Sequence, residues 1–544
     1  MQIKSIWGDE FNLPDESITA KKIATKLSSA KPAVVSKRSS TKKLSIQEQL
    51  DFIYENVRRV LGKFVDRTIT LRTKEALHDY ISAAIKNGVI DIDTETNRSL
   101  DPLTCKLMGP CIYTPGQKNA YIPINHVDWR TGERLQNQLT EEDVKEEFER
   151  LVDTRIIMHN GKFDYQVIKC TTGCVLNVYW DTMIAAKILD STERAGLKAQ
   201  YISKVDSSLE KYSIETFFSE IPYEFVDPEI FALYAATDAF MTHGLYEYQK
   251  RIFERPENEG LYNVFMSVEM PVLIPTAEME LNGVAVDIDY AKRLSVKYHA
   301  QADEIDAAIE KELVALKPTI DQWRTTPDAN VKPPKKRGEG FGKSKNEQLS
   351  DPVAVTSPTQ LAILLYDVLQ IPAVDKKSPR GTGQDILERI KHPICKLIVQ
   401  KRGIEKLLGT YIDKIPEIRN PKDGKVHTHF NQTGTETGRY SSSDPLNLQN
   451  IPSHEKSVRM IFQASPGYVM LGSDFAAQEP RLLATYANDQ NMKQAFIDNR
   501  DLYAIVAEKV YNNRYEDNLQ EHADGSPFPE GKERRSNCKS ILLG

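Results

Sequence analysis

Carboxylates in three separated segments of the chain have the spacing of a metal-dependent hydrolase. Asp93 and Glu95 lie two residues apart in GVIDIDTET, so a strand would turn both toward one side. Asp164 follows the strand-like segment IIMHN, and Tyr234 and Asp238 lie four residues apart, on one face of an expected helix. Such a set would hold two divalent ions ~3.5–4 Å apart, and hard oxygen ligands suit Mg²⁺ or Mn²⁺. The pattern predicts a hydrolase of phosphodiester bonds with two ions in its active site.

Two neighbouring aspartates have simpler interpretations. Asp91 would share the strand face of Asp93, and we interpret it as structural. Asp181 begins DTMIAAKIL, where an aspartate before an apolar helical pattern is typical of a helix N-cap.

Hydrogen-bond donors are concentrated between residues 435 and 452, in a stretch rich in Gly, Ser, Asn and Pro. The sequence alone indicates turns here. Arg439, Asn447 and Gln449 also offer donors to the acceptors that every base pair presents in the minor groove. The stretch therefore suits contact with a duplex that is independent of base sequence.

A further carboxylate and two cations follow near the C-terminal end. Asp474 ends an expected apolar strand, 468–471, and Glu479 follows on an expected helix. Arg535 and Lys539 lie four residues apart, so a helix would present both on one face, as a grip for a triphosphate. A solvated helix face is the alternative for this pair.

The elements that must position these residues change along the chain. From 61 to 254 the pattern is α/β, with strands expected in GVIDIDTET, NAYIPINH and IIMHN. Residues 261–316 favour long helices, 317–356 favour a surface loop rich in Pro, Gly and Lys, and 358–419 favour helices again. Helices are also expected at 140–152, 181–189 and 228–250, and mixed α/β structure from 427 onward.

Composition narrows the class of protein. The 544 residues are enough for two or three domains, and no apolar run is long enough for a membrane span or a secretion signal. The formal net charge of −6 argues weakly against nucleic-acid binding, but carboxylate metal sites also contribute acids. The six cysteines are scattered without a zinc-binding pattern, as expected of reduced thiols in a cytosol.

The N-terminal segment 17–47 is basic and contains no aromatic residue. It carries too few apolar side chains to fold by itself. It is either a solvated linker or a tail that touches nucleic acid or a partner.

The carboxylate motifs resemble those of DEDD-type 3′–5′ exonucleases, in the variant with tyrosine in the third motif. The resemblance implies that Asp93, Glu95, Asp164 and Asp238 are metal ligands and that Tyr234 orients the attacking water. It also assigns Asn160 to contact with DNA.

The whole stretch from about residue 61 resembles family A DNA polymerases of the bacterial DNA polymerase I and phage replicase type. EMPVL (269–273), NGV (282–284), NPKDGKVHT (420–428) and the run 437–474 carry this resemblance. It implies an α/β and α+β multidomain fold, with an RNase H-like exonuclease domain followed by a partial right-hand polymerase. The implied parts are a basic tail at 1–60, the exonuclease at 61–255, a thumb region at 256–426 and a partial palm with the start of the fingers at 427–544.

The same resemblance assigns roles in the polymerase part. Asp474 would hold two catalytic Mg²⁺ or Mn²⁺ ions, and Glu479 would exclude a ribose 2′-hydroxyl. The remaining assignments are Arg439, Asn447 and Gln449 to primer–template DNA, and Tyr503, Arg535, Lys539 and Leu543 to the incoming dNTP. Tyr503 and Leu543 depart from the usual His and aromatic residue, and Ala477 departs from a usual Gln, which affects nucleotide affinity and sugar discrimination.

The chain stops at Gly544, before the second metal carboxylate of the family. We therefore expect no polymerisation by this chain alone, and either a second polypeptide that supplies the rest of palm and fingers or a truncated sequence. The loop 317–356 is a solvated loop, a clamp on DNA phosphates or a site for a processivity factor. The expected function is a proofreading DNA polymerase, of phage origin and acting in the cytoplasm of a bacterial host on primer–template and single-stranded 3′ ends. A stand-alone exonuclease and a non-catalytic DNA-binding subunit are the alternatives.

Overall fold

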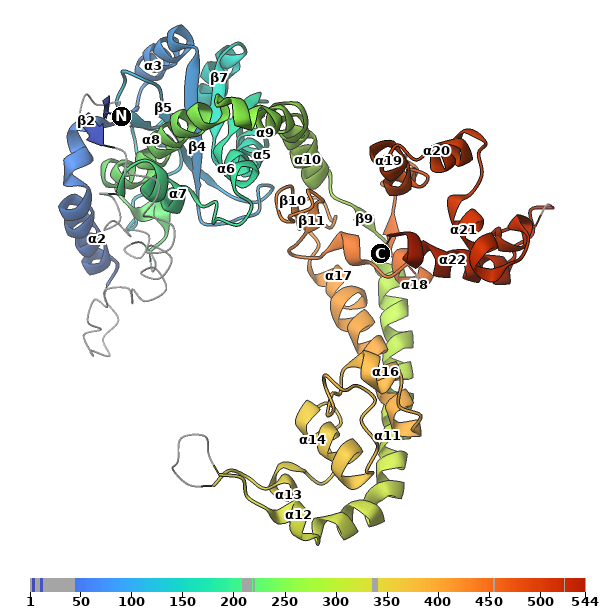
Figure 1. Ribbon diagram of the computed structural model, residues 1–544. Coiled ribbons are helices and arrows are strands. Elements are labelled where there is room, and N and C mark those ends of the chain that lie inside the picture. The colour runs from blue at the N-terminus through green and yellow to red at the C-terminus, as the bar shows by residue number, and fades with distance from the viewer. Residues whose placement is uncertain are drawn as a thin grey trace. The chain divides into compact units, whose positions relative to one another are not determined.

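The computed structural model describes residues 2–4, 10–12, 45–207, 218, 221–334, 341–453, 455–522 and 524–543. The chain divides into two compact units, Met1–Pro466 and Gly467–Gly544. Most of the basic segment 17–47 lies outside the described residues. Ahead of it, β1 (Gln2–Lys4) and β2 (Glu10–Asn12) pair antiparallel. The mixed α/β, multidomain class expected from the sequence is found (Figure 1).

A mixed sheet forms the centre of the first part of unit 1. Among the described residues its strands follow the order β3-β6-β5-β4-β7-β8. The central strand β4 pairs antiparallel with β5 and parallel with β7. The strands are β3 (Thr68–Thr70), β4 (Val89–Thr96), β5 (Leu107–Tyr113), β6 (Asn119–Tyr121), β7 (Arg155–Met158) and β8 (Val178–Asp181).

Alternation along β4 separates apolar from acidic side chains. Ile90 and Ile92 are fully buried in the core that also contains Leu77 of α3 and Ile168 of α5. The intervening aspartates face the other side of the sheet, where Cys111 packs in the core containing helix α8. The helices around the sheet are α2 (Ile46–Leu61), α3 (Lys74–Asn87), α4 (Glu141–Phe148), α5 (Gly161–Thr172), α6 (Thr182–Leu189), α7 (Leu197–Lys204) and α8 (Pro228–Phe253). The helices expected at 140–152, 181–189 and 228–250 are thus present as α4, α6 and α8.

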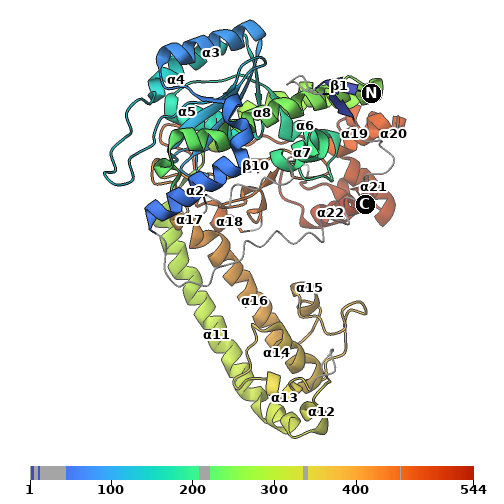
Figure 2. The same cartoon turned by 90° about the vertical axis from the view of Figure 1, so that its left-hand side faces the viewer.

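A helical stem follows within unit 1. Its long helix α11 lies side by side with α16 in both views (Figure 1 and Figure 2). Before the stem, α9 (Glu259–Val264) and α10 (Met270–Asn282) pack against the core of the sheet. The stem contains β9 (Ala285–Val286), α11 (Ile288–Arg324), α12 (Pro327–Asn330), α13 (Lys345–Gln348), α14 (Pro358–Ala362), α15 (Gln384–Leu387), α16 (Pro393–Leu407) and α17 (Lys414–Glu417).

The prediction of a surface loop at 317–356 is wrong for the first part of that segment. Helix α11 continues through Pro318 to Arg324. A proline inside a helix removes one hydrogen bond, but Ile320 and Trp323 beyond it are buried in the core of the stem. Packing of these two side chains outweighs the local signal of the proline.

The basic residues of this segment are partly neutralised. Lys332 pairs with Glu347 at 2.7 Å, and Lys345 pairs with Asp367 at 2.6 Å. Residues 335–340, which include three more of the cations, lie outside the described residues. The contacts seen hold the segment to the stem.

Short strands and helices complete unit 1, and helices form unit 2. β9 pairs antiparallel with β12, and β10 pairs antiparallel with β11. Unit 1 ends with β10 (Phe430–Asn431), β11 (Ser441–Ser442), α18 (Lys456–Arg459) and β12 (Phe462–Gln463). Unit 2 contains α19 (Gln478–Tyr486), α20 (Gln490–Ile497), α21 (Leu502–Tyr511) and α22 (Pro529–Leu543).

The prediction of an apolar strand at 468–471 is also wrong. These residues have no regular structure, and Val469 and Leu471 are 88% and 93% exposed. A strand requires a neighbour to accept and donate its backbone hydrogen bonds, and within the described residues none pairs with this segment.

Within the described residues, no helix combines the length and the apolar character that crossing a bilayer requires.

Candidate active site

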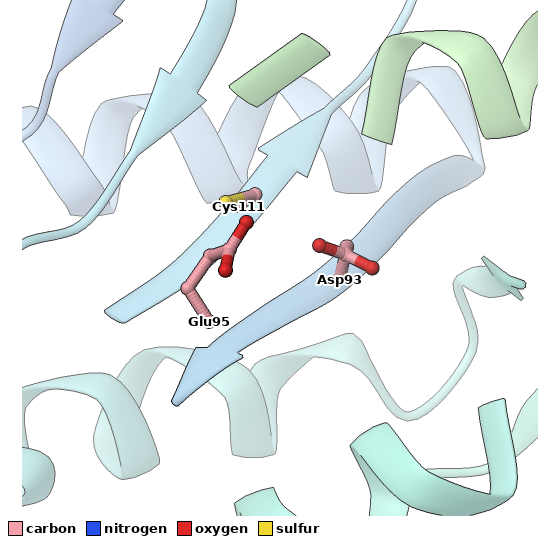
Figure 3. Close-up of side chains that lie close together, drawn as sticks. All are labelled: Asp93, Glu95 and Cys111. Atoms are coloured by element: carbon pink, nitrogen blue, oxygen red, sulfur yellow. The ribbon is translucent and has the colours of Figure 1, made fainter. Parts of the chain in front are cut away.

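The central strand β4 brings Asp93 and Glu95 to the face of the sheet that α8 covers. Asp93 lies opposite Cys111 of β5 in the antiparallel ladder. The ladder shifts register between Glu95 and Thr96, a bulge of the kind that re-aims side chains next to active sites. Figure 3 shows Asp93 and Glu95 on the same side of β4, with Cys111 beside them.

Asp164 enters the same site from the turn between β7 and α5. Asn160 adopts the left-handed region with a φ of 62°, and α5 begins at the next residue. Asp164 lies in the first turn of the helix and is 4% exposed. Its Oδ1 accepts hydrogen bonds from the backbone N of Thr94 at 3.0 Å and from Thr94 Oγ1 at 2.6 Å. The carboxylate of α5 is therefore fixed to the strand that carries Asp93.

Asp181 braces the same turn. Its carboxylate accepts from the backbone N of Gly161 at 2.7 Å and from the backbone N of Met183 at 2.8 Å. The second contact is the N-cap of α6, as the sequence predicted. The first contact, which the sequence did not indicate, ties the start of α5 to the start of α6.

Helix α8 supplies Tyr234 and Asp238, one turn apart. Lys198 of α7 lies beside both: its Nζ is 3.5 Å from Asp238 Oδ2 and 4.9 Å from the centroid of the Tyr234 ring. The tyrosine ring is 8% exposed and packs against Phe218, with ring centroids 5.0 Å apart. Nothing in the local sequence indicated Lys198, because it comes from a separate helix.

The electrostatics of the site show that its carboxylates converge. The pKa of Asp93 is raised well above its usual range, first by burial and then by neighbouring negative charges. The charges are those of Asp164, Asp238 and Glu95, and the ammonium of Lys198 opposes them. Burial also raises the pKa of Asp164 to about 7, against the opposing effect of the Thr94 hydrogen bonds. Mutual repulsion of this kind is what divalent cations relieve, and an all-oxygen carboxylate set fits Mg²⁺ or Mn²⁺.

Asp91 belongs to a separate buried pair. Its Oδ2 lies 2.7 Å from Nδ1 of His243, on α8, and both side chains are buried. The pair joins β4 to α8 on the same face of the sheet as Asp93. This agrees with a structural role for Asp91, whereas the partnership with His243 was not indicated by the sequence.

The predicted minor-groove donors lie around the β10–β11 hairpin of unit 1. Arg439 and Gln449 are exposed. Asn447 is half-buried, and its side chain accepts hydrogen bonds from the backbone N of Gln449 at 3.0 Å and of Asn450 at 3.2 Å. Asn447 is therefore engaged in shaping the turn.

In unit 2, the predicted nucleotide-binding residues separate into two groups. Arg535 Nε donates to Asp501 Oδ2 at 2.6 Å, and its guanidinium lies 4.8 Å from the centroid of the Tyr503 ring. Glu479 lies near enough to contribute to the raised pKa of Tyr503, whose largest cause is burial.

The second group is open to solvent. Asp474 and Lys539 are exposed, and within the described part of the chain no contact joins Asp474 to the Arg535 cluster. Leu543 ends α22, and its side chain lies outside the described atoms. The structure thus gathers Glu479, Tyr503 and Arg535 but does not gather Asp474 with them.

Comparison with known proteins finds two families along the chain. Residues 68–253 match the model of the 3′-5′ exonuclease family, and residues 335–524 match DNA polymerase family A. The DNA polymerase I of Treponema pallidum is 28% identical over 484 residues, covering 80% of this chain and 44% of the relative. That of Chloroflexus aurantiacus is 28% identical over 497 residues, covering 87% and 46%. The thermostable DNA polymerase I of Thermus aquaticus is 33% identical over 261 residues, covering 46% and 27%.

The chain therefore spans less than half the length of these relatives. A solved structure, the POL domain of Pol1 from M. smegmatis in complex with DNA primer-template and dNTP, matches with a TM-score of 0.62 and 21% identity. The match covers 86% of this chain and 69% of that one, and it establishes the fold.

Proposed function

We propose a function from the premise that this chain carries a 3′-5′ exonuclease domain and a DNA polymerase family A domain. The function is removal of nucleotides from the 3′ end of DNA, as the proofreading activity of a DNA-directed DNA polymerase. The observation that supports it most is the convergence of Asp93, Glu95, Asp164 and Asp238 from β4, α5 and α8.

Two divalent ions, when bound by these carboxylates, would supply an activated water and stabilise the leaving oxygen. The residues of the chain do the positioning. Thr94 holds Asp164 against β4 through its two hydrogen bonds. Lys198 offsets part of the negative charge at Asp238, and Tyr234 presents a hydroxyl to orient the attacking water. Asn160, at the left-handed turn before α5, is proposed to contact the DNA strand.

The polymerase domain is proposed to hold primer–template DNA and the incoming dNTP. Arg439 and Gln449 would face the minor groove, with Asn447 fixing their turn. Glu479 is proposed as the sugar gate. The triphosphate is assigned to Arg535 and Lys539, next to Tyr503 and Leu543, with the catalytic ions at Asp474. Because Arg535 is paired with Asp501, a triphosphate must displace that carboxylate or share the guanidinium with it.

The exposed segment around Asp474 favours the exonuclease as the activity of this chain by itself. Tyr468, Met470 and Phe475 are 78%, 67% and 76% exposed, and a site that orders metal ions needs its carboxylates held. We propose that further polymerase sequence, in a second polypeptide or in a longer form of the chain, packs on this segment. A stand-alone 3′–5′ exonuclease that grips DNA with its polymerase domain is the second candidate.

The proposed setting is a phage replicase in the cytoplasm of a bacterial host, and this rests on the motif resemblance alone. A processivity factor at 317–356 is likewise proposed from that resemblance. The paired lysines of that segment favour attachment to the stem over a free phosphate clamp.

The exonuclease proposal is tested with D93A/E95A on a single-stranded DNA labelled at its 5′ end, with Mg²⁺. Trimming should be lost in this variant and kept in the matched control D66A/E75A, because Asp66 and Glu75 are exposed acids outside the site. Equal trimming by both variants would refute the assignment. Extension of a primer by the same purified chain would separately refute the expectation that it does not polymerise alone.

A further inference from the structure

A thiol lies beside the exonuclease carboxylates. Cys111 stands on β5 directly opposite Asp93. Ligand atoms of Asp93, Glu95 and Cys111 all lie within 4.8 Å of one another (Figure 3). Sequence pattern alone indicates no special role for this cysteine, because the pairing of β4 with β5 is what brings it to the site.

These separations are compatible with one shared ion. Zinc binds thiolate sulfur at about 2.3 Å and carboxylate oxygen at about 2.0–2.2 Å, so two ligands of a tetrahedral ion are about 3.6 Å apart. Side-chain rotations that move the ligand atoms by about 1 Å would bring all three to one ion. Asp93 and Glu95 are only partly buried, which leaves them room for that adjustment.

The thiol of Cys111 is enclosed by the protein next to the carboxylates. Cys111 is fully buried, and no hydrogen-bond partner is found for it within the described residues. By contrast, Cys105 donates to the carbonyl of Pro102 at 3.7 Å. A divalent cation would attract the negative charges of both the thiolate and the carboxylates, so it can be shared among them.

We propose that Cys111 is a sulfur ligand in the exonuclease metal centre, sharing one ion with Asp93 and Glu95. The inference rests on the proposed exonuclease function. On binding, the thiol gives its proton to solvent and the sulfur forms a bond to the cation, so one proton is released for each ion bound through sulfur.

A mixed sulfur and oxygen donor set changes which cations the site prefers. Carboxylates alone suit Mg²⁺ and Mn²⁺, whereas thiolate selects softer ions such as Zn²⁺ and Cd²⁺. The centre should therefore bind Cd²⁺ more tightly than four carboxylates would, and Cd²⁺ should displace Mg²⁺ from it.

The direct test is titration of the metal-free chain with Cd²⁺ while the ultraviolet sulfur-to-cadmium charge-transfer absorbance is followed. The Cys111→Ser variant keeps the size of the side chain but removes the sulfur. We expect it to lose one saturable component of the absorbance and to bind Cd²⁺ roughly tenfold more weakly at that site. The Cys174→Ser variant is the matched control, because Cys174 is a buried thiol of the same domain that is not part of the carboxylate group.

A second variant distinguishes binding of Cd²⁺ at this site from binding of Cd²⁺ by other thiols. D93N/E95Q retains Cys111 but removes the charged partners, and it should lose the same component. If Cys111→Ser and the parent chain give the same absorbance and Cd²⁺ affinity, the inference is wrong and Cys111 is not a metal ligand.

The result is distinguishable from failure of the exonuclease proposal. Mg²⁺-dependent trimming with no difference in Cd²⁺ absorbance would leave the exonuclease in place and remove Cys111 from the ligand set. The Cys111-dependent absorbance without trimming would establish the ligand and overturn the proposed activity.

Discussion

The Nδ1 atom of His243 lies 2.7 Å from Oδ2 of Asp91, in a pair that is 3% and 0% exposed. Asp91 is two residues before Asp93 on β4, and His243 is five residues after Asp238 on α8. The pair therefore joins the two elements that carry most of the proposed metal ligands. It holds them together on the face of the sheet that also carries Asp93.

Removing one partner of this pair should destabilise the chain strongly. His243→Leu leaves the Asp91 carboxylate buried without its partner, which costs about 3–5 kcal/mol. The double variant Asp91→Val/His243→Leu replaces both groups with apolar ones and should recover most of that loss. Denaturant unfolding of the parent, both single variants and the double variant forms a complete cycle. A double variant no more stable than the worse single variant would contradict this account.

The hydroxyl of Tyr234 should matter for catalysis and little for stability. Tyr234→Phe keeps the ring packed against Phe218 but removes the group proposed to orient the water. We expect kcat for 3′ trimming to fall roughly 10- to 1,000-fold, with the KM for single-stranded DNA nearly unchanged. Tyr201→Phe, at another buried tyrosine whose ring packs against Phe240, is the control and should retain full activity. A fall in melting temperature that accounts for the lost activity would argue for a packing role.

Lys198 should stabilise the metal-free site in particular. Its ammonium offsets the repulsion among the carboxylates, so Lys198→Met should lower stability in EDTA by about 1 kcal/mol or less, since the pair with Asp238 is partly exposed. At saturating Mn²⁺ the bound cations take over that role, and the difference from the parent should nearly vanish. Thermal unfolding with and without metal measures both values. A loss of stability that is the same in both conditions would place the effect outside the metal centre.

Burial of His126 predicts loss of stability in acid. Burial lowers its pKa to about 4 from the ordinary 6.5, although its contact with the Val226 carbonyl opposes the shift. Nδ1 lies 2.9 Å from that carbonyl and Nε2 lies 2.7 Å from the Tyr121 hydroxyl. A carbonyl only accepts, so Nδ1 carries the proton and Nε2 accepts from the tyrosine. Both nitrogens of the neutral ring are thereby satisfied.

The sign of the effect follows from where the proton binds. Below pH 6.5 the unfolded chain protonates this histidine and the folded chain does not, so stability falls as the pH falls from about 6.5 toward 4. The decrease in the free energy of unfolding reaches about 3 kcal/mol near pH 4, and there is no decrease above pH 7. His126→Gln should be less stable at pH 7 but should show a shallower decline between pH 6.5 and 4.5 in denaturant unfolding. Parallel pH profiles for the parent and the variant would rule out His126 as the source.

Much of the proposed exonuclease site follows from local sequence. The two-residue spacing of Asp93 and Glu95 and the four-residue spacing of Tyr234 and Asp238 determine which side chains share a face once a strand and a helix form. The structure brings these residues together with Asp164, while their roles stay predictions. Lys198, Cys111 and His243 were missed because each reaches the site through pairing of elements that are distant in sequence.

The errors have a common physical origin. The proline at 318 and the apolar run at 468–471 are local signals, and each was interpreted without its tertiary surroundings. Burial of Ile320 and Trp323 in the stem keeps α11 helical beyond the proline. Residues 468–471 have strand-like composition, but a strand also depends on a neighbour, which sequence pattern alone does not supply.

Helix α5 is held in place by residues that follow position 255 in the chain. Lys162 Nζ contacts Glu280 of α10 at 2.5 Å and the Phe430 carbonyl of β10 at 2.7 Å, and Gln166 Nε2 donates to Glu280 at 2.8 Å. Glu280 and Gln166 are 5% and 2% exposed. Excising residues 61–255 would open these buried contacts to water two residues from Asp164. Residues 61–255 are thus not structurally independent, because α10 and β10 build part of the wall behind the proposed metal centre.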